Sequence, residues 1–457
     1  MISLRPAKSV QGEVKLPISP DLLFMAALGA CAAKRNAVIS DVDESDVISD
    51  IIRALHGHAS VELNDSTMQI SPLSSAGGDD PAILLTLPES LLPYRMIYLF
   101  MGLGMGKTVT VKSISSKQTE DIIAQAKRVG ITLETVELGQ SAMTGLRATN
   151  FDSGVAEGCY PTEDNCTALL AFLFGKGEKL AFTIADYHLS TPLRQLANIF
   201  GFTVNAKLTA TDDPLAKRMR FLKGKQREQQ TQSIIYTIEA DFCRREDSSG
   251  ALNITIPGDE ILAAALIALK RLIPKGNLEI SNVPLETWAS QTIAFVKKMG
   301  GKPDIRNSGK TSFGLCGIVS VPKSEYFGRK TRCVPLYQYI GQLPCMAIIA
   351  AFAEGKSVFR ELEALRLSEP DGLDQLEKCL RPLGVRHGEM PDGIVVEGAK
   401  EFDGFDILEP LPAHIAVAFY VAGLRCMGKT SIADDYIFAR WPSLEKMINE
   451  ICEFRNK

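Results

Sequence analysis

One pattern recurs six times along this chain of 457 residues and limits the possible folds more than any other feature. Each copy has a Pro near the start of an apolar helix, a turn of small or basic residues and a strand of alternating apolar residues. An amphipathic helix and one or two further strands follow. The clearest copy runs from Leu87-Pro88 through Gly106-Lys107 to Gly130. Pro suits the first helical turn and Gly suits a helix end, so the positions of Pro and Gly predict where helices begin and end.

The first helix of each copy is apolar on nearly every face, as residues 346–352 and 415–424 show. Such a helix has to be buried, whereas an amphipathic second helix, such as that expected over residues 288–299, can lie at the surface. Three copies can close around their apolar helices with the sheets outside. The six copies therefore predict an α/β protein of two domains, and the polar segment 241–250 is the expected break between the third and fourth copies.

Composition excludes several classes of protein. Hydrophobic residues make up 46% of the chain and charged residues 23%, which is typical of a globular protein. Because 50 Lys and Arg stand against 54 acidic residues, no basic field favours a nucleic-acid partner. No apolar run approaches the length of about 20 residues that spans a bilayer, and the first residues lack the apolar stretch of a secretory signal. We therefore expect no membrane partner and a cytoplasmic location.

The cysteines and histidines do not have the spacing of a metal site. The ten Cys contain no C-x-x-C pair, and the five His contain no H-E-x-x-H motif. Cys31, Cys345 and Cys426 lie in apolar stretches, where a free Cys behaves as a small hydrophobic residue. The basic segment 216–227 has two interpretations, a solvated hairpin loop or a loop that contacts an anion or a partner.

Four segments carry a resemblance to a known family. They are residues 256–265 (IPGDEILAAA), 352–356 (FAEGK), 363–373 (EALRLSEPDGL) and 414–423 (HIAVAFYVAG). Together they resemble the enolpyruvyl transferase family, most of all the 3-phosphoshikimate 1-carboxyvinyltransferases (EPSP synthases), over essentially the whole chain. The resemblance implies two inside-out α/β domains, each of three βαβαββ-type repeats, that close on substrates in a cleft between them. It also implies that the N-terminal segment joins the second domain, so we expect one domain over residues 16–245 and another over residues 1–15 plus 246–457.

The implied reaction moves the enolpyruvyl group of phosphoenolpyruvate onto a hydroxyl of shikimate 3-phosphate and releases phosphate, a step of aromatic amino acid biosynthesis. The resemblance implies no metal or organic cofactor. The implied partners are small anions, namely phosphoenolpyruvate and a phosphorylated or carboxylated acceptor, and the oligomeric state is left open. A site of this kind needs several Lys and Arg to hold phosphates and a carboxylate, together with a proton donor and a proton acceptor.

Most of the family's ligand-binding positions carry other residues in this chain. Pro20, Asp21 and Met25 stand where the family has a Lys-Ser pair and an Arg, and two further family cations fall on Gly372 and Ile415. The aligned residues that could still serve a site are Glu369 and His414 for catalysis, and Arg95, Lys117, Asp164 and Arg366 for substrate binding. A hydrogen bond to a charged group contributes about 1.5–3 kcal/mol, so the loss of four cations predicts a much weaker hold on anions.

Each retained residue also has a structural interpretation. Arg95 could be an ion-paired or snorkelling residue, and Lys117 could be solvated. Glu369 could favour a helix N-terminus, and His414 could be a satisfied histidine at the head of a buried helix. Three functions therefore stay open. They are a carboxyvinyl transferase of the EPSP synthase type with an altered site, a related enzyme with another acceptor or reaction, and a non-catalytic relative that binds a ligand or a partner.

Overall fold

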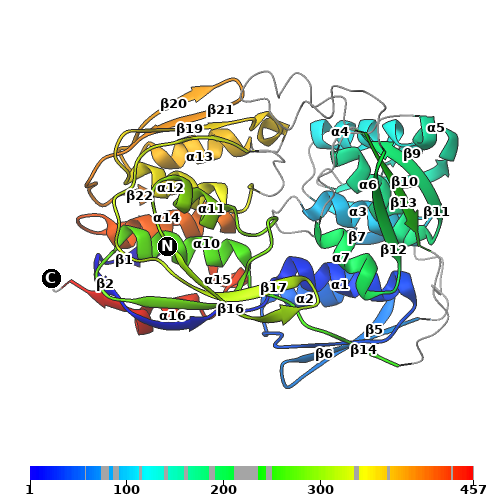
Figure 1. Ribbon diagram of the computed structural model, residues 1–457, viewed down its shortest axis with the longest axis horizontal. Coiled ribbons are helices and arrows are strands. Elements are labelled where there is room, and N and C mark those ends of the chain that lie inside the picture. Colours follow the sequence, from blue (N-terminus) through cyan, green and yellow to red (C-terminus); the bar gives the residue numbers. More distant parts are fainter. Residues whose placement is uncertain are drawn as a thin grey trace.

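The chain folds as a mixed α/β protein, as the sequence predicts, in two groups of helices and strands that we call the first and second lobes (Figure 1). The computed structural model describes the chain except residues 57, 74–81, 86–91, 113–115, 138–142, 159–162, 185–190, 210–234, 243–249, 334–338, 368–370, 434–435 and 456–457. The basic segment 216–227 and most of the polar segment 241–250 lie outside the described residues.

The first lobe is built around three apolar helices, α1 (Pro20–Ala33), α3 (Leu92–Leu103) and α6 (Glu163–Lys176), which pack on one another. Shorter helices flank them, namely α2 (Asp46–Ala54), α4 (Ser116–Arg128), α5 (Ser153–Gly158) and α7 (Thr191–Ile199). One sheet has the order β14 (Leu252–Ile254), β4 (Ala37–Ser40), β6 (Thr67–Pro72), β5 (Ala59–Asn64). The second has the order β7 (Ala82–Leu85), β8 (Thr108–Lys112), β10 (Met143–Phe151), β9 (Ile131–Val136). The third has the order β11 (Lys179–Ile184), β13 (Ile235–Asp241), β12 (Thr203–Thr209).

The second lobe repeats this plan around α10 (Glu260–Leu272), α12 (Leu343–Ala351) and α14 (Ala413–Arg425). Its other helices are α11 (Gln291–Lys298), α13 (Gly372–Leu380), α15 (Ile437–Arg440), α16 (Leu444–Ile451) and the 3₁₀ helix η4 (Glu363–Leu367). One sheet has the order β16 (Asp304–Thr311), β17 (Gly314–Ser320), β15 (Leu278–Pro284), β3 (Gly12–Lys15). The second has the order β18 (Lys330–Arg332), β19 (Lys356–Arg360), β21 (Gly393–Glu397), β20 (Arg386–Met390). The third joins β1 (Ile2–Leu4), β23 (Thr430–Ile432) and β22 (Asp406–Ile407), and a two-stranded sheet joins β2 (Ala7–Val10) to β24 (Cys452–Phe454).

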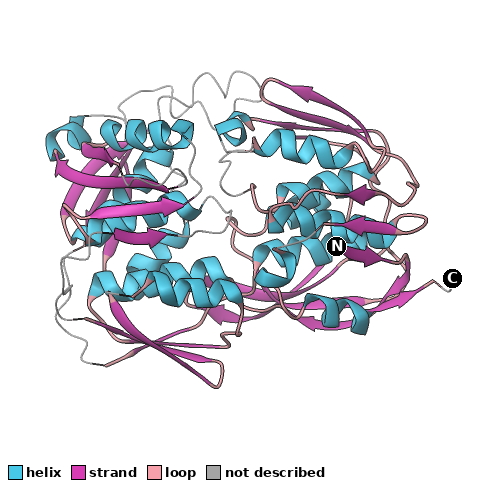
Figure 2. Cartoon of the chain, turned by 180° about the vertical axis from the view of Figure 1, so that it is seen from behind, coloured by secondary structure: helices cyan, strands magenta, loops and turns pink. Residues whose placement is uncertain are grey.

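The apolar helices lie inside each lobe, with strands along the outer margins (Figure 2). Every residue of α12 is buried, and so is every residue of α14 between Ile415 and Leu424. Since burial of a large apolar side chain contributes about 1.5–3 kcal/mol, these helices dominate the stability of their lobe. The prediction of buried first helices is confirmed. The arrangement as six equivalent repeats stays a prediction.

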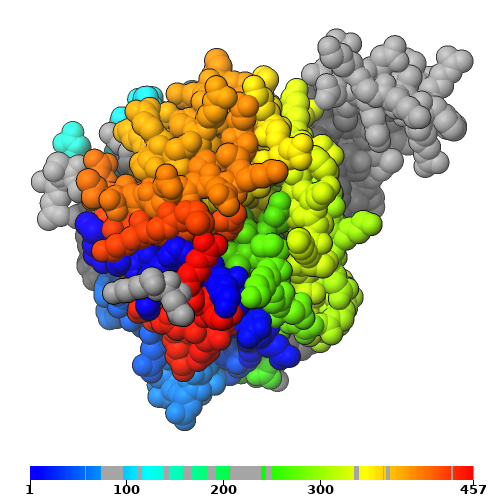
Figure 3. Space-filling model, turned by 90° about the vertical axis from the view of Figure 1, so that its left-hand side faces the viewer, coloured from blue at the N-terminus to red at the C-terminus, as the bar shows by residue number. Residues whose placement is uncertain are grey.

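The C-terminal helix ends earlier than the sequence predicts. We expected a helix over residues 442–454, but α16 ends at Ile451 and the chain continues as β24. That strand pairs with β2 near the N-terminus, where the side chains of Lys8 and Ser9 donate to the Glu453 carboxylate at 3.0 and 2.8 Å. Figure 3 shows the two ends of the chain side by side, in blue and red. A helix pattern cannot reveal a pairing between residues more than 440 positions apart in sequence.

The described cysteines are free and buried, in agreement with their prediction as core residues. They include Cys31, Cys345 and Cys426. Burial raises the pKa of the Cys31 thiol to about 12, so this thiol is protonated at neutral pH. Among the described helices, none combines the length and the apolar character that a membrane crossing requires.

The chain passes between the lobes twice. Leu16 belongs to the core of the second lobe and Ile18 to that of the first, so the first passage lies at Pro17. On the return, Ile256 still belongs to the first core and Ile261 to the second. The domain limits 16–245 and 1–15 plus 246–457 stay a proposal. Because β14 pairs with β4, we propose that the return falls after Ile256 and not near residue 245.

Candidate active site

The two passages lie side by side and are tied to each other by backbone hydrogen bonds. The Ser19 amide donates to the Pro257 carbonyl at 2.9 Å, and the Asp259 amide donates to the Pro17 carbonyl at 2.8 Å. We call these two segments, residues 16–19 and 256–259, the crossovers. Gly258 allows their close approach, since a Cβ at this position would lie 2.5 Å from the Asn282 carbonyl oxygen.

A buried apolar helix begins directly after each crossover. The Ser19 hydroxyl caps α1 by accepting from the Leu22 amide at 3.5 Å. Oδ1 of Asp259 caps α10 by accepting from the Ile261 and Leu262 amides at 2.8 and 3.0 Å. The positive ends of both helices therefore meet at the crossovers, and a helix N-terminus favours negative charge.

A buried ion network, made of Asp21, Asp259, Arg440 and Trp441, connects the starts of these helices. Nη2 of Arg440 donates to Oδ2 of Asp21 at 3.1 Å and to Oδ2 of Asp259 at 2.9 Å. Nε1 of Trp441 donates to the same Asp259 oxygen at 3.2 Å. Asp259 is 0% exposed, and both Asp21 and Arg440 are at most 6% exposed. Burial lowers the pKa of Arg440, but the charges of Asp259, Asp21 and Glu260 outweigh this effect and raise it.

Glu260 lies beside this network and carries an unusual carboxyl group. Its Oε2 atom is buried and has no hydrogen-bond partner among the described residues. Burial, followed by the charges of Asp259 and Asp21, raises the pKa of Glu260 to about 8. The carboxyl group is therefore protonated at neutral pH and able to donate a proton.

His414 lies at the start of α14, where it is partly buried. Burial and then the positive charge of Arg440 lower its pKa to about 4. Its imidazole is therefore neutral at pH 7 and able to accept a proton. The neutral imidazole of His414 and the protonated carboxyl group of Glu260 are both influenced by the Arg440 guanidinium. Their environments suit opposite roles in proton transfer, acceptor for the imidazole and donor for the carboxyl group.

The other predicted site residues whose side chains the structure describes belong to different lobes. Lys117 lies exposed in the first turn of α4, in the first lobe. Arg366 lies on η4 of the second lobe. Within the described part of the chain, no hydrogen bond or ion pair joins Lys117, Arg366 and His414 to one another. The backbones of Arg95 and Asp164 belong to α3 and α6, but their side chains lie outside the described part, as does the whole of Glu369.

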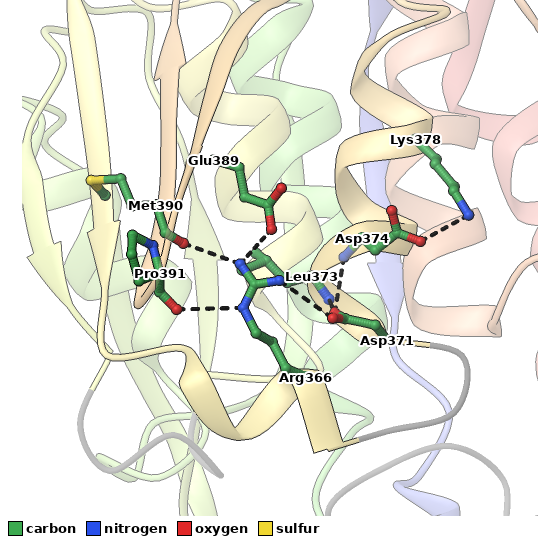
Figure 4. A network of polar contacts seen from close by, with 8 residues as sticks. All are labelled: Arg366, Asp371, Leu373, Asp374, Lys378, Glu389, Met390 and Pro391. Carbon is green, nitrogen blue, oxygen red and sulfur yellow. Dashed lines mark hydrogen bonds and ion pairs between the residues drawn. The ribbon is translucent and has the colours of Figure 1, made fainter.

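Arg366 is held by contacts within its own lobe (Figure 4). It donates to the Asp371 carboxylate at 3.3 Å, to the carbonyls of Met390 and Pro391 at 3.1 and 3.4 Å, and to the Glu389 carboxylate. Asp371 also caps α13. A substrate that engaged Arg366 would have to replace part of this set.

Sequence reasoning missed the residues of the buried ion network apart from Asp21. The sequence places Asp21 only at a ligand-binding position of the family, whereas the structure shows its carboxylate paired with Arg440. Two features of the sequence could have indicated these residues. Asp259 and Glu260 are adjacent acidic residues just before an apolar helix, and Arg440 is a single cation within the apolar stretch 437–442. A charge in such a stretch is buried only when it is paired.

The described residues contain no group of three or more His, Cys, Asp or Glu side chains that could hold a metal ion.

Comparison with known proteins gives the family of the chain. The model of the EPSP synthase (3-phosphoshikimate 1-carboxyvinyltransferase) family matches residues 226–447. A 3-phosphoshikimate 1-carboxyvinyltransferase from Thermoanaerobacter sp. is 28% identical over 39% of this chain and 42% of its own length. This match thus spans less than half of that relative. The corresponding protein of Roseiflexus sp. is 23% identical over 94% of both chains.

Solved structures agree over the whole chain. EPSP synthase from Acinetobacter baumannii matches with a TM-score of 0.67 and 16% identity, covering 98% of both chains. The enolpyruvyl transferase NikO from Streptomyces tendae matches with a TM-score of 0.67 and 14% identity, covering 100% of this chain and 98% of its own. At these identities the likeness shows the fold alone. Together with the sequence matches, it places this chain in the enolpyruvyl transferase family, among the EPSP synthase-like proteins.

Proposed function

We propose that this protein transfers an enolpyruvyl group from phosphoenolpyruvate to an acceptor that carries less negative charge than shikimate 3-phosphate. The observation that carries the proposal is the pairing of Arg440 with Asp21 and Asp259 at the crossovers. The family resemblance implies ligand-binding groups at residues 20–25. Here the cation that meets Asp21 among the described residues, Arg440, is already paired with two carboxylates.

Electrostatics supports a less charged acceptor. Among the described residues, the two carboxylates and one guanidinium of the buried ion network sum to −1, which the partial positive charges at the starts of α1 and α10 reduce. Repulsion of one further negative charge at about 6 Å amounts to roughly 3 kcal/mol at an effective dielectric constant of 20. A phosphate on the acceptor at that distance would meet nearly twice this repulsion. A neutral hydroxyl compound would avoid it. The proposal therefore requires the anionic groups of phosphoenolpyruvate to bind farther from the network than the acceptor does.

The same proposal assigns roles in proton transfer. The reaction needs an acid that protonates the methylene carbon of phosphoenolpyruvate and a base that takes the proton of the acceptor hydroxyl. We assign the base to His414, whose imidazole is neutral at pH 7. The catalytic role of Glu369 and the substrate contacts of Arg95, Lys117, Asp164 and Arg366 rest on the resemblance.

A second candidate is a non-catalytic relative that binds a ligand or a partner. The observation in its favour is the engagement of Arg366 with Asp371 and Glu389, which leaves this predicted anion contact occupied by the protein itself. This candidate predicts binding without turnover.

Phosphate release from phosphoenolpyruvate tests the proposal. We would compare shikimate 3-phosphate with shikimate, which differs only by the phosphate, and then with a panel of hydroxyl compounds. The expected result is faster release with shikimate or with an uncharged hydroxyl compound than with shikimate 3-phosphate, and a loss of about 10²–10⁴-fold in His414→Gln. Faster release with shikimate 3-phosphate would refute the acceptor assignment. Stabilisation by a ligand in a thermal shift assay, without release for any acceptor, would favour the non-catalytic candidate.

A further inference from the structure

The buried ion network joins the two lobes at the point where any movement between them has to pivot. Asp21 belongs to α1 of the first lobe, whereas Asp259, Arg440 and Trp441 belong to the second. The Arg440–Asp21 contact is therefore the arm of the network that passes from one lobe to the other. It lies directly beside the two crossovers, which are the covalent connections between the lobes.

Other contacts converge on the same place. The Asn282 side chain donates to the Leu16 carbonyl at 3.3 Å, and the Asn282 carbonyl accepts from the Gly258 amide at 3.0 Å. Asn282 adopts a positive φ of 61°, a left-handed conformation that Asn accepts more readily than most residues. Trp288 and Phe313 of the second lobe pack into the core of the first. The crossovers are therefore held from several directions.

The energetics of the network favour a geometric role. Removing carboxylates and a guanidinium from water is costly, and apolar side chains of similar volume often give equal or greater stability. The geometry of this network is nevertheless restrictive, because both carboxylates meet the same Nη2 atom of Arg440, whose buried Nε has no hydrogen-bond partner among the described residues. Its value lies in permitting one relative position of the elements that it joins.

We propose that the Arg440–Asp21 arm is an interlobe latch, which fixes the angle between the lobes before any ligand binds. The family resemblance implies lobes that close on their substrates. In this chain the latch holds the pivot in one arrangement, so the cleft is preorganised instead of being shaped by closure. Arg440 is then a positioning residue, and its role does not depend on which acceptor the protein uses.

Amide hydrogen exchange followed by mass spectrometry tests the latch. Asp21→Asn cuts the interlobe arm and leaves the Arg440–Asp259 pair within the second lobe. We expect peptides that contain the Ser19 and Asp259 amides to exchange about tenfold faster or more, because one charged contact is lost. Peptides from α3 and α12, in the interior of each lobe, should exchange as in the wild type. Arg440→Met should give the same pattern with a larger effect.

Asp392→Asn is the matched control. It makes the same chemical change and removes an ion pair with Arg360, at 2.5 Å, that lies within the second lobe. Exchange at the crossovers should stay at the wild-type rate in this variant. Two results in Asp21→Asn would overturn the latch. One is an equal acceleration of amide exchange in all peptides, and the other is exchange of the crossover amides at the wild-type rate. If Arg440→Met fails to fold, the Asp21→Asn result decides alone.

Discussion

The buried carboxyl group of Glu260 predicts a specific dependence of stability on pH. Its pKa rises from 4.5 to about 8 in the folded protein because burial and two neighbouring carboxylates disfavour the ionised form. In the unfolded chain the same group is solvated and ionises near its ordinary value. Since each pH unit corresponds to about 1.4 kcal/mol, the full shift would change the free energy of unfolding by roughly 5 kcal/mol.

The sign follows from proton linkage. Below about pH 4.5 Glu260 is protonated in both states, and its contribution to the stability of the fold is fully present. As the pH rises, only the unfolded state releases the proton, so the folded state loses stability until the pH passes about 8. Glu260→Gln keeps a neutral side chain of the same size at every pH, so it lacks this loss.

Urea unfolding at pH 5, 6.5, 8 and 9, followed by circular dichroism, measures the effect. The free energy of unfolding of the wild type relative to Glu260→Gln should fall steadily up to about pH 8 and then level. Relaxation around the side chain could absorb half of the shift and would still leave roughly 2 kcal/mol. Glu120→Gln, on the exposed face of α4, controls for a change of net charge. A difference between wild type and Glu260→Gln that is the same at every pH would refute the reasoning.

Three further predictions concern single positions. The lowered pKa of His414 predicts that wild-type stability falls as the pH drops from 6.5 through about 4, and that His414→Gln lacks this fall in acid unfolding experiments. Gly258→Ala places a Cβ 2.5 Å from the Asn282 carbonyl oxygen and 2.6 Å from the Leu16 Cβ, so we expect a loss of about 1–3 kcal/mol in urea unfolding. Ile348→Ala opens a cavity beside a fully buried helix and should cost about 2–5 kcal/mol, whereas a cost below 1 kcal/mol would contradict the packing of α12.

Local patterns in the sequence were sufficient to predict the buried apolar helices. Apolar runs of helical length, such as α12, have few ways to avoid water, so their burial follows from composition and period alone. Turn glycines act locally too, and Gly106, in the turn of the clearest copy, adopts a positive φ of 82°. The end of α16 could not be predicted in this way, because β24 depends on a partner strand from the other end of the chain.

For the candidate site, too, some features follow from the sequence and others only from the tertiary structure. The sequence by itself determined that Asp21 stands at a ligand-binding position of the family, where the resemblance implies a Ser, and that His414 begins an apolar helix. Only the tertiary structure decided that Asp21 meets Arg440, which is 419 positions away, and that burial and then the charge of Arg440 lower the pKa of His414. The physical reason is that a residue type fixes the charge a side chain can carry, whereas the energy of that charge depends on its burial and on its neighbours, which the fold brings together from distant parts of the chain.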